Sequence, residues 1–145
     1  MQQIFRSALV PYSDLQMYQL IDDIDSYDQF VPYCQSTKTI QRSDNQVTAE
    51  LVVAKSGFAK SFTTRNTLSP PNSIRMDLVD GPFKHLSGDW KLTKLSDSAC
   101  KIELDIQFEF SNKLASLAFS SMFNQLVQSM VTAFTERAEK VYGEQ

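Results

Sequence analysis

Apolar and polar side chains alternate without a fault in one segment near the end of the chain, Cys100-Lys101-Ile102-Glu103-Leu104-Asp105-Ile106-Gln107-Phe108-Glu109-Phe110. Successive side chains of a β-strand point to opposite faces of the sheet. The segment is therefore predicted to be a strand with one dry face and one wet face, as in an antiparallel sheet that packs on one side only.

The segment that follows is predicted to be one long helix. Ser111 is suited to cap its start and Gly143 to end it, and no glycine or proline lies between them. Apolar residues recur along it mostly at steps of three or four: Leu114, Leu117, Phe119, Met122, Phe123, Leu126, Met130, Phe134, Ala138 and Val141. Such a stripe indicates an amphipathic helix that covers the dry face of the sheet.

The start of the chain has a strand pattern over residues 2–10, which Pro11 ends. Ser13 and Gln16 have the spacing of a capping box, which predicts a short helix. Its expected inner face holds Leu15, Tyr18 and Ile21. Asp25 is expected to cap a second short helix that ends before Pro32.

Residues 33–110 have the texture of a meander of strands. Turn signals divide them at 43–45, 56–57, 70–72, 80–82 and 96–98. In the strand after Gly57, residues Phe58, Phe62 and Leu68 share one parity and hence one face. The predicted fold is α+β: a single domain, 1–145, in which a curved antiparallel sheet wraps around the long C-terminal helix.

The composition excludes several classes of protein. The N-terminal residues lack the features of a signal peptide, and no apolar run approaches the roughly 20 residues of a membrane span, so a cytoplasmic location without a transmembrane segment is expected. Two cysteines provide no disulfide framework. A net charge of −3 argues against a dedicated nucleic-acid binder, although it permits a local basic patch.

Motifs for common chemistry are absent from the sequence. One His and two distant Cys do not supply an ordinary zinc site, and no nucleophile elbow, P-loop or dinucleotide turn is present. Cys34 could be a nucleophile, but a packed and inert thiol is favoured. We therefore predict no catalytic residue and no metal site.

Four motifs carry a family resemblance: Tyr27–Cys34, Gly81–Leu86 with Trp90, Phe108–Phe110, and Met130–Ala138. In this order the chain resembles the coenzyme Q-binding family of the START-like helix-grip superfamily over essentially its whole length. It departs from many relatives in one aromatic residue, because Tyr33 stands where they carry Trp.

The resemblance implies two functions that are not exclusive, and the wider helix-grip superfamily adds a third alternative. The first is a non-enzymatic protein that holds ubiquinone or another lipid in a hydrophobic cavity, with a link to respiration. The second is a toxin or regulator that binds the large ribosomal subunit and blocks subunit joining. The third is a cyclase-like enzyme, for which the sequence offers no convincing acid/base pair. No cofactor is expected other than a ubiquinone or isoprenoid lipid held under the first function, and the oligomeric state is left open.

Two sets of residues are expected to bind other molecules, one inside the cavity and one at the protein surface. The cavity is expected to be lined by Phe30, Tyr33, Phe62, Phe83, Trp90, Phe108, Phe123, Leu126, Met130 and Phe134. The same aromatic and aliphatic residues are equally consistent with an ordinary packed core. A partner surface is expected at Lys55, Lys60, Arg65 and Lys84, since contacts with ribosomal phosphates require cations.

Overall fold

The computed structural model describes residues 1–111 and 116–143, which form one sheet and three helical segments. The elements are β1 (Gln2–Val10), α1 (Asp14–Asp22), the 3₁₀ helix η1 (Ile24–Gln29), β2 (Cys34–Arg42), β3 (Gln46–Lys55), β4 (Phe58–Ser69), β5 (Ser73–Asp80), β6 (Phe83–Ser96), β7 (Ala99–Phe110) and α2 (Ser116–Tyr142).

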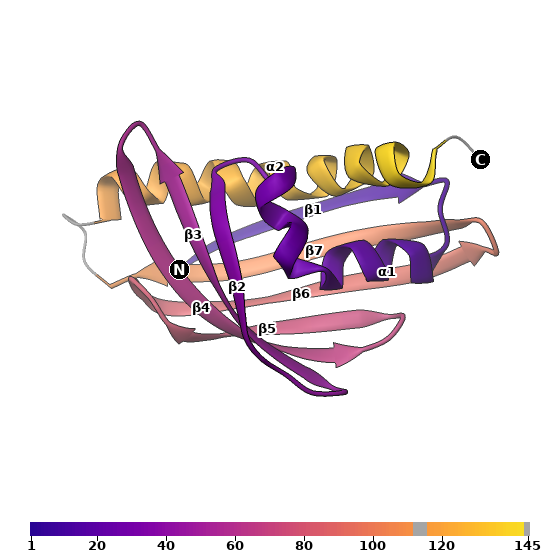
Figure 1. Cartoon of the computed structure of the whole chain (residues 1–145), viewed down its shortest axis with the longest axis horizontal. Helices are drawn as coiled ribbons and strands as arrows, with labels where there is room; N and C mark the ends of the chain where they lie inside the picture. The colour runs from indigo at the N-terminus through magenta and orange to yellow at the C-terminus, as the bar shows by residue number, and fades with distance from the viewer. Residues whose placement is uncertain (112–115, 144–145) are drawn as a thin grey trace.

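The sheet has the strand order β1-β7-β6-β5-β4-β3-β2, and every neighbouring pair is antiparallel. Strands β1, β7 and β6 run roughly along α2, whereas β2, β3 and β4 run steeply across this direction (Figure 1). The sheet is therefore strongly curved, and α2 lies along its concave side. This arrangement confirms the predicted α+β fold.

Strand β7 shows the predicted two-faced pattern. Cys100, Ile102, Leu104, Ile106 and Phe108 are buried, and the residues between them are exposed or half-buried. The strand pairs on one side with β1, where Val10 lies opposite Cys100, and on the other with β6, where Trp90 lies opposite Leu104. The alternating segment is thus the second strand from one edge of the sheet.

The two short helices are partly as predicted. The capping box is present, because Gln16 N donates to Ser13 Oγ at 3.1 Å and Ser13 N donates to Gln16 Oε1 at 2.9 Å. The inner face of α1 holds Met17 with Tyr18 and Ile21, so the assignment of Leu15 to that face was wrong.

The predicted cap of the second helix was also wrong. Only Asp23 separates α1 from η1, so Asp25 already lies inside the first turn of η1 and cannot cap it. Its carboxylate instead accepts a hydrogen bond from Thr39 Oγ1 at 2.8 Å. The residue in the N-cap position, Asp23, makes no side-chain cap hydrogen bond.

Helix α2 buries Phe119, Met122, Phe123, Leu126, Met130, Phe134 and Ala138. Gly143 ends it with a positive φ of 75° and donates from its N to Glu139 O at 2.8 Å, as predicted. The predicted start after Ser111, and Leu114 with it, fall among residues 112–115 and so lie outside the described residues.

Two positions of the predicted stripe do not face the sheet. Leu117 is 72% exposed, because two residues before Phe119 is nearly the opposite side of a helix with 3.6 residues per turn. Val141 is about half exposed. In the last turn the neighbouring Tyr142 makes the inward contacts instead, since its hydroxyl donates to Gln16 O and its ring lies 5.9 Å from that of Tyr12.

Candidate functional site

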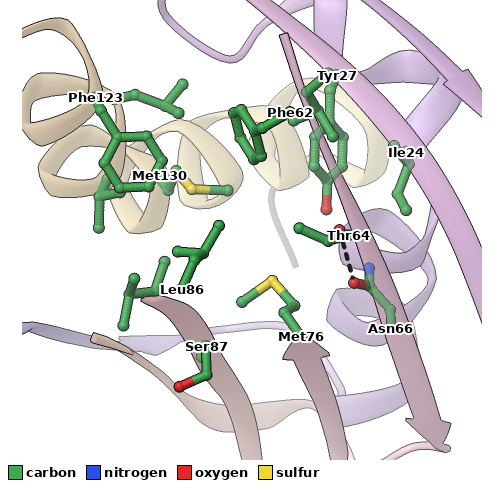
Figure 2. Close-up of a pocket in the computed structure, with 15 residues that line it drawn as sticks. Ile24, Tyr27, Phe62, Thr64, Asn66, Met76, Leu86, Ser87, Phe123 and Met130 are labelled. Atoms are coloured by element: carbon green, nitrogen blue, oxygen red, sulfur yellow. Dashed lines mark hydrogen bonds between the residues drawn. The ribbon is translucent and has the colours of Figure 1, made fainter. Parts of the chain in front are cut away.

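A cavity of about 60 Å³ lies between α2 and the concave face of the sheet. Figure 2 shows the side chains around it. Its lining comes from η1, from β3 to β7 and from α2: Ile24, Tyr27, Leu51, Phe62, Thr64, Asn66, Met76, Leu86, Ser87, Gly88, Ile106, Phe123, Leu126, Val127 and Met130. One water needs at least about 10–15 Å³, so the cavity has room for a few waters.

The polar part of the lining is a pair of side chains on β4. Thr64 and Asn66 are both buried, and Thr64 Oγ1 donates to Asn66 Oδ1 at 3.1 Å (Figure 2). They follow Phe62 at steps of two and therefore face α2 with it. Thr64 and Asn66 were not among the predicted site residues, although they share the parity of Phe62 and Leu68 and could have been identified by it.

Gly88 on β6 keeps the floor of the cavity open. A Cβ added there would lie 2.9 Å from Ile106 Cγ1 and 3.0 Å from Met76 Cε, so any side chain would displace its neighbours. The adjacent Ser87 contributes little polarity to the cavity. Its hydroxyl points away from the centre of the cavity in Figure 2 and lies 3.1 Å from His85 Nε2.

Tyr27 is the one ionisable side chain in the lining of this cavity. Its hydroxyl donates to Ile21 O, and burial raises its pKa above the ordinary value for tyrosine. A phenol with a raised pKa that already donates to a backbone carbonyl is poorly suited to serve as a proton donor or acceptor at neutral pH. The cavity therefore lacks a pair of groups suited to general acid–base chemistry.

A cluster of phenylalanines closes one end of the cavity. The ring of Phe83 lies 5.7 Å from Phe62, 4.9 Å from Phe123 and 5.5 Å from Phe119, in each case close to edge-to-face. Phe108 lies 5.0 Å from Phe123. Edge-to-face packing fills the space between these rings. Consequently Phe83 and Phe108, which we expected to line the cavity, are buried against other rings and do not line it.

A second aromatic cluster closes the other end. Phe134 lies 5.2 Å from Tyr27, 5.1 Å from Phe30 and 5.3 Å from Trp90, with interplanar angles of 74°, 80° and 83°. Of these four rings, only Tyr27 reaches the cavity. Of the expected lining residues, Phe30 and Trp90 each pack against Phe134 instead.

Tyr33 also lies outside the lining. Its hydroxyl donates to Gln125 Oε1 on α2 at 2.5 Å, and Lys55 Nζ lies 5.2 Å from the centre of its ring. Four of the ten expected residues therefore line the cavity, namely Phe62, Phe123, Leu126 and Met130. Ligand binding by any of the ten remains a prediction.

The four expected surface cations are all exposed, but they do not form one patch. Lys55 and Lys60 lie on the β3–β4 hairpin, and Lys84 lies beside the β5–β6 turn; both turns lie at the same end of the molecule (Figure 1). Arg65 is farther along β4, opposite Asp77 of β5. Within residues 1–111 and 116–143, none of these four forms an ion pair.

Neither a metal centre nor a membrane span is found in the part of the chain that the structure describes. No three His, Cys, Asp or Glu side chains there are grouped so that they could hold an ion. Over the same residues, none of the helices combines the length and the apolar character needed to cross a bilayer.

Comparison with known proteins places the chain in a family. Residues 10–135 match the model of the polyketide cyclase / dehydrase and lipid transport family. The chain is 54% identical over 143 residues to the ribosome association toxin RatA of Escherichia coli, covering 99% of this chain and 90% of that one. It is 30% identical to a mitochondrial coenzyme Q-binding protein, COQ10 homolog B of Xenopus laevis, covering 96% of this chain and 59% of that one.

Solved structures show the same fold. The ZhuI aromatase/cyclase of a Streptomyces superimposes with a TM-score of 0.82 at 15% identity, over 96% of this chain and 94% of that one. The 18 kDa protein CC1736 of Caulobacter crescentus superimposes with a TM-score of 0.76 at 28% identity, over 99% of this chain and all of that one. The chain therefore belongs to the polyketide cyclase / dehydrase and lipid transport family of START-like proteins, and within it to the relatives of RatA.

Proposed function

We propose that this protein is a non-enzymatic binding protein, which holds an isoprenoid quinone or a similar lipid between α2 and the sheet. The observation that carries the proposal is a mostly apolar lining with one buried polar pair, Thr64 and Asn66. A flat head group with carbonyl oxygens can accept from the Asn66 amide, while the apolar walls suit an isoprenoid tail. The name of the Xenopus laevis relative, a coenzyme Q-binding protein, supports this ligand class.

The size of the cavity sets a condition on this function. Pockets for drug-sized ligands have volumes of roughly 300–1,000 Å³, far above the 60 Å³ found here. A quinone must therefore enlarge the cavity when it binds. Met76 from β5 and Met130 from α2 both line the cavity (Figure 2), and their unbranched side chains can change rotamer to give way.

The ionisable groups support binding over catalysis. A cyclase of this fold would need a proton donor or acceptor inside the cavity, and Tyr27 is held by Ile21 O. The likeness to the aromatase/cyclase, at 15% identity, concerns the fold alone. The named functions of the two curated relatives, ribosome association and coenzyme Q binding, favour a non-enzymatic role.

Extraction and quenching test the quinone proposal. Protein purified from membrane-containing lysate is expected to carry an isoprenoid quinone, identified by organic extraction and mass spectrometry. Added ubiquinone is expected to quench Trp90, the single tryptophan. Asn66→Leu is expected to weaken binding about tenfold through the loss of its hydrogen bonds, while Thr67→Val, at an exposed position of the same strand, leaves it unchanged. Protein that carries no quinone after purification, and whose Trp90 fluorescence added ubiquinone does not quench, would contradict the proposal.

Ribosome association is the second proposed function. It is favoured by the name of the relative at 54% identity and by the three lysines at one end of the molecule, Lys55, Lys60 and Lys84. Exposed cations that lack carboxylate partners are free to contact phosphates. This function agrees with the cytoplasmic location expected from the sequence.

Sucrose gradients test this second function. Overexpression of the protein is expected to reduce the 70S peak and increase the free subunits. Charge reversal of Lys55, Lys60 and Lys84 to Glu is expected to abolish the effect. The matched control reverses Lys91, Lys94 and Lys101 on β6 and β7 and is expected to retain it. Unchanged subunit joining on overexpression, or equal loss in both triple variants, would count against the assignment.

A further inference from the structure

Two segments that are about a hundred residues apart in the sequence meet at one contact on α2. Arg137 Nη2 donates to Gln29 Oε1 at 3.0 Å, and its guanidinium lies 5.0 Å from the centre of the Phe30 ring. Next to it, Phe134 packs edge-on against both Phe30 and Tyr27. Arg137 thus connects the end of η1 to α2, the helix that covers the cavity.

The element fastened in this way forms a side wall of the cavity. Ile24 and Tyr27 of η1 are in the lining. A 3₁₀ helix is held by fewer and poorer hydrogen bonds than an α-helix, and η1 has no side-chain cap at its start. At its end, the backbone N–H groups of Phe30 and Val31 both donate to Tyr27 O. The start of the wall is held to β2, because Asp25 accepts from Thr39 Oγ1, whereas its end is held by contacts with α2.

A second fastening lies farther along the same segment. Tyr33 has a φ of 66°, in the left-handed region that non-glycine residues rarely adopt, and its hydroxyl donates to Gln125 Oε1. Gln125 and Arg137 are roughly 18 Å apart along the helix axis, at 1.5 Å per residue. Residues 24–33 thus lie beside α2 and are attached to it at two separate points, both at the protein surface.

We propose that residues 24–33 are a hinged wall through which the ligand enters the cavity, and that Arg137 and Gln125 are its latches. The inference rests on the proposed binding function, because the cavity of about 60 Å³ is too small for a quinone unless a wall moves. Thr39 Oγ1 of β2 holds Asp25 at the start of η1, and the Tyr27 hydroxyl holds the middle of η1 to Ile21 of α1. The wall therefore opens from its far side, where Phe30 leaves Phe134. Arg137 is a positioning residue, since it is absent from the lining.

Exchange kinetics of a ubiquinone with one isoprenoid unit, followed by quenching of Trp90 in stopped flow, test the latch. Arg137→Ala and Tyr33→Phe are each expected to raise the association and dissociation rates by the same factor, about three- to tenfold, with little change in Kd. Arg137→Lys is expected to fall between, because it keeps a cation near Phe30. Lys140→Ala, an exposed position of the same helix, is the control. A rise in the dissociation rate alone would mean a damaged site and would overturn the proposal.

A cleavable cross-link tests the same wall in the opposite direction. Gln29→Cys with Arg137→Cys, joined by a short disulfide-containing bis-maleimide, is expected to slow quinone exchange at least tenfold until the link is reduced. The native thiols of Cys34 and Cys100 are buried and do not compete. Unchanged exchange in the linked protein would refute the hinged wall.

Amide hydrogen exchange gives a readout that needs no ligand. In Arg137→Ala, the amides of Phe30 and Val31 are expected to exchange at least threefold faster, while those of β6 and β7 are unchanged. If wild-type protein binds no quinone, the binding proposal fails. Hydrogen exchange still shows whether Arg137 holds residues 24–33 against α2. Equal exchange rates of the Phe30 and Val31 amides in wild type and in Arg137→Ala would exclude a role of Arg137 as a latch.

Discussion

Trp90 on β6 meets Phe134 on α2 edge to face, with ring centroids 5.3 Å apart and an interplanar angle of 83°. Both side chains are almost completely buried. Phe134 also contacts Tyr27 and Phe30 of the η1 segment. The Phe134 ring therefore links the three elements around the cavity: α2, strand β6 of the sheet, and the η1 segment.

Removal of the Phe134 ring is expected to be strongly destabilising. Phe134→Ala should lower the free energy of unfolding by about 3–5 kcal/mol, the usual cost of emptying a buried phenylalanine site. Leu117→Ala on the same helix should change it by less than about 0.5 kcal/mol, since Leu117 is exposed. Urea titrations followed by circular dichroism measure both. Equal losses would mean that α2 is not seated as described.

Gly88 is expected to control the capacity of the cavity. Gly88→Ala places a methyl group against Ile106 and Met76, so we expect a loss of stability of about 1–3 kcal/mol and weaker quinone binding. The double variant Gly88→Ala, Met76→Ala should lose less stability and less binding than the two single variants added together, because the shortened side chain of residue 76 makes room for the new methyl group. Binding is measured by quenching of Trp90 and stability by urea. A double variant that is worse than the sum of its parts would contradict this account.

The two buried thiols predict a loss of stability at alkaline pH. Burial raises the pKa of Cys34 and of Cys100 to about 11, from an ordinary value of 9.0. The folded state then binds more protons than the unfolded state between these values, so stability is intact below pH 9 and falls as the pH rises toward 11. Urea midpoints at pH 8 and pH 10.5 measure the fall. The double variant Cys34→Ala, Cys100→Ala should show a smaller one, and an equal fall would assign it to other groups.

The sequence predicted the strands and the roof of the cavity better than its walls. The alternation from Cys100 to Phe110 determines which side chains share a face, and this information is local. Phe83, Trp90 and Phe108 were correctly assigned to the interior, but no local pattern shows whether an inward ring meets a cavity or another ring. That outcome depends on how sharply the sheet curves, which is set by contacts among distant strands.

Other errors came from the ends of helices and from polarity. Leu117 and Val141 were assigned to the buried stripe because they are apolar, but Phe119 and Tyr142 beside them make the inward contacts. Thr64 and Asn66 were missed because the interior was sought among apolar residues. Arg137 was part of a quoted motif, but its contact with Phe30 joins segments that only the fold brings together.

The pairing of β1 with β7 has a consequence for how the chain is made. Gln2 pairs with Phe108 and Val10 with Cys100, so β1 has no partner until about a hundred further residues have been synthesised. During translation both edges of β1 therefore remain unpaired. The strand joins the sheet only after β7 has left the ribosome. Contacts so distant in sequence make folding slow. A chaperone that holds nascent chains is therefore expected to crosslink to residues 2–10 of stalled chains that end before β7, and to release them once β7 has emerged.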